Sequence, residues 1–401
     1  MIPIREAIRI VLQNSPVFDS EAVTLADALG RILAEDIVAD SDLPPFDRAQ
    51  MDGYAVRAAD VAETPALLRI AGESAAGAGW HHDMKTGEAV RIMTGAPVPA
   101  GADAVQQVEL TRESDSRVEI LEPVETGRSI VRRAAEIKAG EIVLRAGEEI
   151  NAAMIATLAS FGYARVRVGR RPRVAVMATG SELVDVDQKP ARDQIRDSNN
   201  YTIAAYATQA GASVVRLPLA GDDTEELKRQ IAKATETSDV LITSGGVSMG
   251  VYDFTKAALK ELGAEIFFER VALRPGKPTV FARLGRTLIF GLPGNPVSVA
   301  VTFNLFARTA LRAMQGAAQP GLTAETAVLA KAVKGSVERE SYLPAVLRTD
   351  EKGTLLAEPL KWGGSSDFVA FARATALINV PAGVKSIEAG EPIRIFTLPG
   401  L

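Results

Sequence analysis

Between Arg171 and Met314 the sequence alternates short apolar runs with helical stretches, and this alternation constrains the fold more than any other feature. The apolar runs lie at 174–177, 214–217, 240–243, 266–268, 279–281 and 288–290, and the helical stretches lie at 200–210, 224–237, 253–262 and 296–314. A regular alternation of strands and helices is typical of a doubly wound α/β domain with a mostly parallel sheet. The sequence therefore predicts such a domain over 171–315.

The chain has a different texture on both sides of this central domain. Stretches 3–13, 24–35 and 150–161 carry apolar residues at helical spacing. From about 54 to 137, and again from 320 onward, short apolar runs are separated by glycine and proline, which indicates strands and turns. We expect an α/β multidomain protein with a helical N-terminal domain (1–44 plus 140–170), an inserted β-rich domain (45–139) and a C-terminal β-barrel-like domain (320–401).

Composition excludes several classes of function. Lys and Arg number 45 against 50 acidic residues, and a net charge of -5 argues against broad binding of nucleic acid. The sequence contains no cysteine, which rules out disulfides, thiolate zinc sites and cysteine nucleophiles. Charges interrupt the N-terminal stretch where a signal peptide would be apolar, and no apolar run approaches the ~20 residues of a membrane span. We expect a cytoplasmic protein that binds neither nucleic acid nor membrane.

Histidine chemistry is an equally poor candidate. The only two histidines, His81 and His82, are adjacent, so their side chains point in different directions on a helix or a strand. Such a pair makes a poor metal site, because histidine ligands must converge on the ion. Catalysis in this chain must therefore depend on carboxylates, Arg, Lys and backbone amides.

Glycine and polar residues follow the predicted strands of the central domain. They occupy 179–182, 221–223, 243–248 and 291–296. Ligands of open α/β sheets bind beyond the carboxyl ends of the strands, where glycine permits close approach of the backbone and helix N-termini offer amides to anions. One Gly-Gly turn alone would be only a turn, but several such ends on one rim predict a nucleotide or pyrophosphate site.

Carboxylates at this rim have both structural and functional interpretations. Asp223 stands three residues before Glu226, the spacing of a capping box, so we expect it to cap the helix at 224. Asp253 is equally compatible with an N-cap and with a ligand. Asp222 is not explained by capping. Glu182, Asp222 and Asp253 could together hold Mg²⁺, which prefers oxygen ligands and phosphate oxygens.

A basic turn carries Arg270, Arg274 and Lys277 ahead of Pro278. It is not a Walker A loop, because the required glycine is missing and proline follows the lysine. A solvated basic turn and an oxyanion cradle are both compatible with this pattern, and the acidic residues on the same rim favour the cradle. In the N-terminal half, Asp52 precedes a glycine, a common turn dipeptide that by itself assigns no function.

Several of these motifs, taken in order, resemble the MoeA family, which includes the C-terminal domain of gephyrin. The matching stretches are 46–57, 91–99, 179–183, 243–248, 275–278 and 291–298. The resemblance implies an elongated homodimer with active sites between subunits, with a molybdopterin adenylyltransferase as a possible partner. It also implies the reaction: molybdate is transferred onto the dithiolene of adenylyl-molybdopterin with release of AMP, in the presence of Mg²⁺.

The resemblance also implies roles for individual residues. Catalytic roles fall to Asp52, Glu182, Asp222, Asp253, Arg274 and Lys277, of which Glu182, Asp222 and Asp253 are the expected metal ligands. A molybdate pocket would include Arg274, Lys277, Pro278, Ser298, Arg339 and Ser365. Contacts to the substrates would further come from Thr94, Ser244, Gly245, Gly246, Arg270, Pro293, Gly294, Asn295 and Pro296.

Three departures from the family pattern bear on turnover. Arg274 stands where the family's Lys-Pro-Gly-Lys-Pro begins with lysine, which keeps the charge and alters the geometry. The family's Arg-Gly-Glu-Asp appears as 133–136 with Ala134, Ala135 and Glu136, and its Gly-Arg-x-x-Phe-x-Arg segment is altered at 338–344, where Pro344 replaces the second arginine. Two alternatives therefore stay open: a molybdopterin adenylyltransferase, which the additional domains disfavour, and a non-catalytic paralogue that binds the pterin or a partner.

Overall fold

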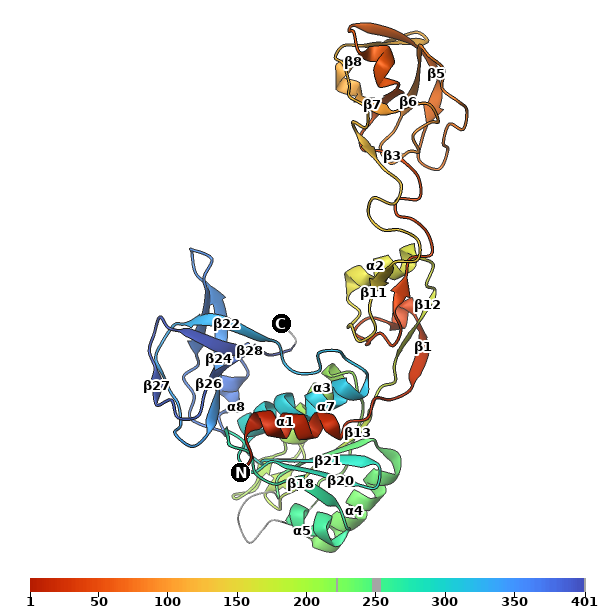
Figure 1. Cartoon of the computed structure of the whole chain (residues 1–401). Helices are drawn as coiled ribbons and strands as arrows, with labels where there is room; N and C mark the ends of the chain where they lie inside the picture. Colours follow the sequence, from red (N-terminus) through yellow and green to blue (C-terminus); the bar gives the residue numbers. More distant parts are fainter. Residues whose placement is uncertain (221–222, 247–253, 400–401) are drawn as a thin grey trace. The chain divides into compact units, whose positions relative to one another are not determined.

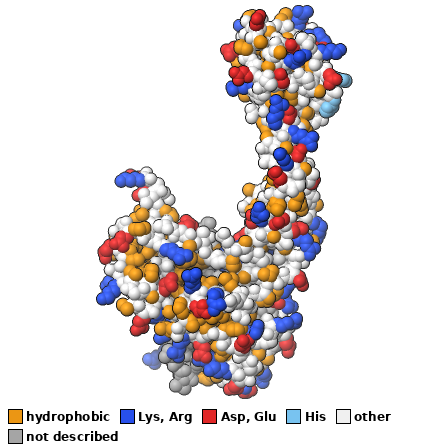
Figure 2. Space-filling view, viewed as in Figure 1, with side chains coloured by type: hydrophobic (Ala, Val, Ile, Leu, Met, Phe, Trp, Pro, Cys, Tyr) orange, Lys and Arg blue, Asp and Glu red, His pale blue; other side chains and the backbone are white. Residues whose placement is uncertain are grey.

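The computed structural model describes residues 1–220, 223–246 and 254–399 and consists of two compact units (Figure 1). Unit 1 comprises Met1–Glu35, Ala146–Asn151 and Arg165–Leu401, and unit 2 comprises Asp36–Arg145 and Ala152–Ala164. Lys and Arg are interspersed with Asp and Glu over the visible surface of each unit (Figure 2). Among the described helices, none is both long and apolar enough to cross a membrane.

The core of unit 1 is a six-stranded sheet in the order β16-β13-β17-β21-β20-β18. Its parallel strands are β13 (Arg173–Ala178), β16 (Ser213–Arg216), β17 (Val240–Ser244) and β21 (Thr287–Leu292). Two antiparallel strands, β20 (Val280–Leu284) and β18 (Glu265–Phe268), complete one edge. The prediction of an α/β domain with a mostly parallel sheet is confirmed.

Helices cover both faces of this sheet. One face packs against α1 (Ile4–Gln13), α3 (Asn199–Gln209), α6 (Pro296–Thr302) and α7 (Arg308–Met314), and the other packs against α4 (Thr224–Thr237) and α5 (Phe254–Glu261). Successive side chains of a strand point to opposite faces, so Val174 and Val176 enter the first core while Ala175 and Met177 enter the second. Burial on both faces explains why these strands are continuous apolar runs.

The long helix predicted over 296–314 is present, with a π-helical turn (Phe303–Ala307) between α6 and α7. The helix predicted over 24–35 is wrong. That segment holds a short 3-10 helix (Leu25–Asp27), and Gly30 then adopts a φ of +72°, which ends regular helical geometry. Ile32 and Leu33 are buried, and their backbones form antiparallel bridges to Glu149 and Val168. These apolar residues therefore belong to strand-like pairing and not to a helix.

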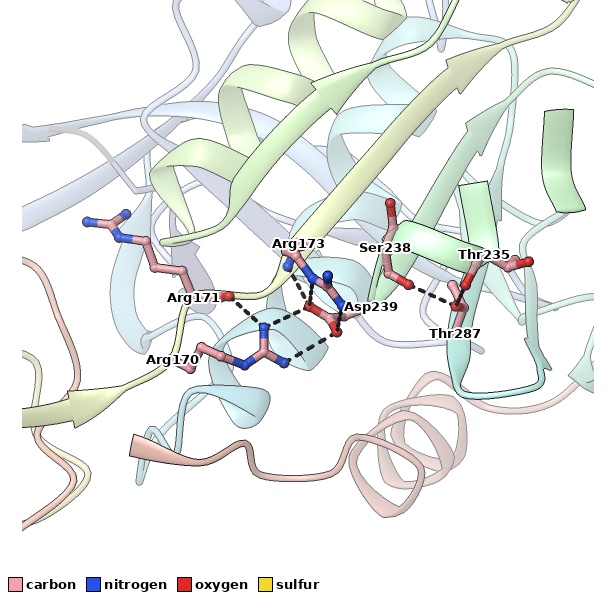
Figure 3. A network of polar contacts seen from close by, with 7 residues as sticks. All are labelled: Arg170, Arg171, Arg173, Thr235, Ser238, Asp239 and Thr287. Carbon is pink, nitrogen blue, oxygen red and sulfur yellow. Dashed lines mark hydrogen bonds and ion pairs between the residues drawn. The ribbon is translucent and has the colours of Figure 1, made fainter. Parts of the chain in front are cut away.

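A two-stranded pairing of β1 (Ser20–Thr24) with β12 (Arg165–Gly169) precedes the central sheet. Just beyond it, a polar network joins this linker to the amino ends of β13 and β17 (Figure 3). Asp239 accepts hydrogen bonds from the Arg170 guanidinium at 3.0 and 3.3 Å, and from the backbone N–H of Arg173 at 2.8 Å. The Arg173 guanidinium donates to the same carboxylate, and the Arg170 guanidinium also lies over the Phe18 ring.

Unit 2 contains a six-stranded sheet in the order β7-β4-β6-β5-β9-β8. Its strands are β4 (Gly53–Val56), β5 (Ala66–Ser74), β6 (Glu88–Ile92), β7 (Ala104–Gln107), β8 (Thr111–Ser114) and β9 (Arg117–Ile120). Two small pairings accompany it, β3 (Arg48–Ala49) with β10 (Ile130–Val131) and β2 (Ile37–Val38) with β11 (Ile142–Leu144). The β-rich module is confirmed, and α2 (Ala152–Ser160) confirms the helix predicted at 150–161.

The C-terminal part of unit 1 forms a closed sheet, because β24 pairs with both β25 and β26 in the order β24-β25-β22-β28-β26. These strands are β22 (Ala324–Leu329), β24 (Glu340–Thr349), β25 (Leu355–Pro359), β26 (Ala376–Val380) and β28 (Pro392–Thr397). Closure removes unpaired sheet edges and confirms the predicted barrel-like domain. A short strand of the central domain, β19 (Leu273–Arg274), adds to β24 in parallel.

Candidate functional site

The carboxyl ends of the central strands meet at one edge of the sheet, as predicted. The Thr179 N–H donates to the Ser244 carbonyl at 2.9 Å, and the Gly245 N–H donates to the Leu292 carbonyl at 3.2 Å. The loop after β13, the Gly-Gly turn after β17 and the loop after β21 therefore share one rim. Gly245 and Gly246 form this Gly-Gly turn.

Backbone geometry explains why two glycines follow β17. Gly245 has a φ of +88°, and a Cβ there would lie 2.4 Å from the Thr179 carbonyl oxygen. Gly246 has a φ of +63°, and a Cβ there would lie 2.4 Å from the Thr255 hydroxyl. Only glycine adopts both conformations without strain and without these collisions. The turn thus allows close packing of neighbouring strand ends at the rim.

Of the three predicted metal ligands, Glu182 is described and the other two lie outside the described residues. Glu182 is exposed directly after β13, and its carbonyl accepts the Ile195 N–H at 2.8 Å. Asp222 and Asp253 fall within 221–222 and 247–253. In the described part of the chain no group of three or more acidic or histidine side chains is arranged to hold a metal. Asp223, by contrast, caps α4 by accepting the Glu225 N–H at 2.9 Å, as predicted.

A cavity of about 1110 Å³ lies between the central sheet and the closed C-terminal sheet of unit 1. We call it the cation-lined cavity. Its lining contains ten residues that were predicted or adjoin predicted ones: Arg274, Pro275, Gly276, Lys277, Pro278, Pro293, Asn295, Ser298, Arg339 and Ser365. Among the described residues, Glu182, Ser244, Gly245, Gly246, Arg270, Gly294 and Pro296 are outside this lining. Arg270 is exposed, and its carbonyl accepts the N–H of Ile2 at 3.1 Å.

The loop 274–278 is fixed by its own backbone. The carbonyl of Lys277 accepts the N–H groups of Val271 at 3.0 Å and Thr279 at 3.1 Å. Gly276 has a φ of +118°, and a Cβ there would lie 2.4 Å from the Thr302 methyl group, so the loop packs directly on the long helix. The Lys277 side chain is left to line the cavity.

The loop 293–298 is fixed by side chains from two distant segments. Asn199 donates to the Gly294 carbonyl at 2.7 Å, and Asn295 donates to the Ser365 hydroxyl at 2.8 Å. The Val297 N–H, in the first turn of α6, donates to the Ser365 carbonyl at 3.0 Å. These contacts bring Ser365 of the C-terminal domain to the loop that carries Ser298, as the resemblance implies.

Positive charge dominates the lining of the cavity. Among the described residues that line it, seven are cationic and one is acidic: Arg274, Lys277, Lys331, Lys334, Arg339, Arg348, Lys361 and the acid Glu358. Glu358 pairs with Lys331 at 2.6 Å and with Arg348 at 3.4 Å. The hydrogen bond from Lys331 holds the pKa of Glu358 below its usual value. The other five cations have no carboxylate partner in the described part of the chain, so the cavity attracts anions.

Sequence reasoning missed several of these residues. Asn199 and four cations of the C-terminal domain (Lys331, Lys334, Arg348 and Lys361) carry no local pattern that indicates a site. The only available signal for Asn199 was its place at the start of a helix that follows a polar segment. The cations lie on separate strands and loops, and only the folded sheet, in which β24, β25 and β22 are neighbours, brings them to one cavity.

Two predicted residues, Asp52 and Thr94, lie together in unit 2. One carboxylate oxygen of Asp52 accepts the Thr94 N–H at 2.7 Å and the Thr94 hydroxyl at 2.8 Å. These two hydrogen bonds, the backbone one foremost, lower the pKa of Asp52 and keep it ionised. A hollow of about 250 Å³ adjoins Asp52, where Glu113 accepts from both Tyr54 and Arg91. Burial, followed by the hydrogen bond to Glu113, raises the pKa of Tyr54 to about 12.

The altered segment 133–136 is held by ion pairs and backbone contacts. Arg133 donates to Asp42 at 2.6 Å, and Glu136 accepts from Arg48 at 3.1 Å. Ala134 has a φ of +60°, a conformation that favours glycine, and glycine is the residue of the family pattern at this position. The substitution thus leaves the turn intact, with backbone strain at one residue.

Fold and site define a class: a multidomain α/β protein whose central sheet and C-terminal β domain together line a cation-rich cavity. Comparisons with known proteins agree segment by segment. Residues 2–162 match the family described as MoeA N-terminal region (domain I and II), 175–313 match the probable molybdopterin binding domain, and 326–398 match the MoeA C-terminal region (domain IV).

Full-length relatives extend the agreement. The chain is 36% identical to a molybdopterin molybdenumtransferase of Bacillus subtilis, over 99% of this chain and 94% of the relative. A Staphylococcus aureus protein of the same name is also 36% identical, over 98% and 95% of the two chains. A crystal structure of a molybdopterin biosynthesis MoeA protein from Pyrococcus horikoshii superposes with a TM-score of 0.85 at 28% identity, covering 99% of this chain and 100% of that one. The chain belongs to the MoeA family.

Proposed function

We propose that this chain is a molybdopterin molybdenumtransferase, which inserts molybdenum from molybdate into adenylyl-molybdopterin with release of AMP. The observation that carries the proposal is the cation-lined cavity, in which five cations have no carboxylate partner among the described residues. A small dianion such as molybdate is the kind of ligand that this charge and these hydroxyls suit. The relatives in Bacillus subtilis and Staphylococcus aureus are named for this activity.

In this proposal the cavity binds and orients the oxyanion. Lys277, Arg274 and Arg339 neutralise the charge of molybdate, while the hydroxyls of Ser298 and Ser365 donate to its oxygens. Because the loops that hold these groups are fixed by backbone and side-chain contacts, little reorganisation is needed as charge redistributes during transfer. The rim at Thr179, Ser244–Gly246 and Gly294 would accommodate the pterin nucleotide, whose phosphoanhydride breaks when AMP leaves.

The Mg²⁺ part of the proposal rests on the chemistry of three carboxylates at strand ends. Glu182 is an exposed oxygen donor at the rim, which suits a hard cation, and Asp222 and Asp253 would complete the set from outside the described residues. When bound, Mg²⁺ would neutralise charge on the pyrophosphate. Asp52 in unit 2 is held ionised by Thr94 and is proposed to act as a further acidic group of the site.

Assembly and location are part of the same proposal. The family resemblance supports a homodimer with active sites formed between subunits, and a possible contact with a molybdopterin adenylyltransferase that delivers the adenylylated substrate. A cytoplasmic location would give the protein access to this intermediate.

The test is release of AMP from adenylyl-molybdopterin by the purified protein, measured with and without molybdate and Mg²⁺. Molybdate-dependent release supports the proposal, and Lys277→Met should lower it at least tenfold by removing a cation from the cavity. The matched control is Lys352→Met, which removes an exposed lysine in a turn of the same domain as Arg339. Consumption of ATP would indicate the adenylyltransferase instead, and tight pterin binding without AMP release would indicate the non-catalytic paralogue.

A further inference from the structure

Arg274 occupies an unusual place, since it belongs at once to the cation-lined cavity and to the C-terminal sheet. As part of β19 it pairs in parallel with β24, with Leu273 opposite Glu340 and Arg274 opposite Ser341. The N–H of Glu340 donates to the Ala272 carbonyl at 3.0 Å just before this pairing. The backbone that leads into the loop 274–278 is therefore part of the closed sheet's ladder.

The side chain of Arg274 adds a second link to the C-terminal domain. Its Nη1 donates to the carbonyl oxygen of Gly335 at 3.3 Å. Gly335 begins the connection 335–339, which joins β23 (Val333–Lys334) to β24 and carries Arg339. The Arg274 guanidinium thus contacts the start of the connection 335–339, which also carries the cavity cation Arg339.

The far side of this connection is held by residues 383–385. The N–H of Gly335 donates to the Lys385 carbonyl at 3.0 Å, and the N–H of Gly383 donates to the Val337 carbonyl at 3.0 Å. A Cβ on Gly335 would lie 2.2 Å from the Val384 carbonyl oxygen, so this backbone is closely packed. Arg274 closes the side that faces the cavity.

We infer that Arg274 is a positioning residue: it fixes the connection 335–339 and thereby holds Arg339 in place to bind an oxyanion. Arginine suits both tasks because one guanidinium has five N–H donors, so Nη1 serves the Gly335 carbonyl while other donors face the cavity. A lysine carries its three N–H donors on one nitrogen, so it cannot span the carbonyl and the anion as the wider guanidinium does. The departure from the family's lysine at this position then has a structural purpose.

An alternative explanation is that Arg274 supplies only charge, in which case lysine would serve equally well. Arg274→Lys separates the two explanations because it keeps the charge, and because lysine stands here in the family pattern and should preserve the fold. Arg394→Lys is the matched control: this exposed arginine of the same domain lies over the ring of Phe396 and is not among the residues that line the cavity.

The first readout is amide hydrogen exchange of the peptide 335–341 in the protein without ligand. Arg274→Lys should speed exchange of the Gly335 and Glu340 amides about tenfold, and Arg394→Lys should leave them unchanged, as expected when one hydrogen bond to a charged group is lost. Unchanged exchange in Arg274→Lys would overturn the inference. Since no substrate is present, this result is independent of whether the proposed function holds.

The second readout is molybdate affinity, followed by the fluorescence of Trp362. Trp362 lines the cavity, and Trp80, the other tryptophan of the sequence, is replaced in a Trp80→Phe background. Arg274→Lys should raise the Kd for molybdate about tenfold, and Arg339→Gln should then have a smaller additional effect than it has alone, because both changes act on one interaction. Equal, additive effects would show that Arg274 acts by charge alone. Absence of molybdate binding by the parent protein would contradict the proposed function.

Discussion

The strongest quantitative prediction concerns the carboxylate of Asp239. It accepts hydrogen bonds from both Arg170 and Arg173, which join the linker to the central sheet (Figure 3). Its side chain is 13% exposed. Replacing it by asparagine keeps the shape and part of the hydrogen bonding but removes the charge that Arg170 and Arg173 share. The expected result is loss of stability in unit 1 with no change of fold.

The size of the loss follows from the pKa of Asp239. Burial would raise it, but the hydrogen bonds from Arg170 and Arg173 outweigh burial and lower the pKa from 3.8 to about 2. This difference corresponds to about 2.5 kcal/mol of stability for the ionised form. Because the folded-state pKa is the lower one, the stabilisation is fully present above pH 3.8 and is lost as the pH falls toward 2.

The assay is urea unfolding of Asp239→Asn and its parent, both in the Trp80→Phe background, so that Trp362 reports on unit 1. Near pH 7 the free energies of unfolding should differ by about 2.5 kcal/mol, and the difference should shrink steadily between pH 4 and pH 3. Asp187→Asn, an exposed carboxyl in the segment between β14 (Leu183–Val184) and β15 (Ile195–Arg196), is the control and should change stability little. A difference below 0.5 kcal/mol at pH 7 (roughly the noise of surface substitutions), or one independent of pH, would refute the charge argument.

Three further predictions follow from single residues. Ala134→Gly should stabilise unit 2 by about 1 kcal/mol, because glycine adopts the positive φ of this position without strain. Trp80 fluorescence in a Trp362→Phe background should then report a higher urea midpoint, and no gain would mean that Ala134 is unstrained. Asp223→Ala should cost about 1 kcal/mol in thermal unfolding through loss of the α4 cap, with Asp223→Asn near neutral. Asp222→Asn should lower AMP release strongly and leave the melting temperature nearly unchanged, whereas a large loss of stability would give Asp222 a structural role.

The sequence predicted what depends on local periodicity. Strands such as β13 and β17 are apolar runs because both faces are buried, and the cap at Asp223 follows from residues within one helical turn. The helix predicted over 24–35 was wrong because local spacing was the only guide: the apolar spacing fits a helix, but pairing with Glu149 and Val168 decides the structure of this segment. Such pairing joins residues more than a hundred positions apart, and local spacing does not contain it.

The candidate site also combines residues that local sequence predicts with residues that only long-range folding brings together. The sequence motifs located the loops 275–278 and 291–298, which are continuous in sequence, whereas Asn199 and Lys361 come near these loops only in the folded chain. Their contribution depends on which strand ends and which turns of the C-terminal sheet come together. Composition and motif can therefore locate these two loops but not the full set of charges around them.

The acidic net charge of the chain and the cation-lined cavity belong together. A protein of net charge -5 repels extended polyanions at long range, while the cavity of about 1110 Å³ holds five cations without a carboxylate partner among the described residues, and these act on any anion small enough to enter. At 0.1 M salt this repulsion is largely screened beyond about 10 Å, but charges inside a cavity are screened less. In the proposed function, selectivity for a small dianion therefore arises from where the cations lie, and the C-terminal domain contributes Lys334, Arg339 and Lys361 to the lining of the cavity.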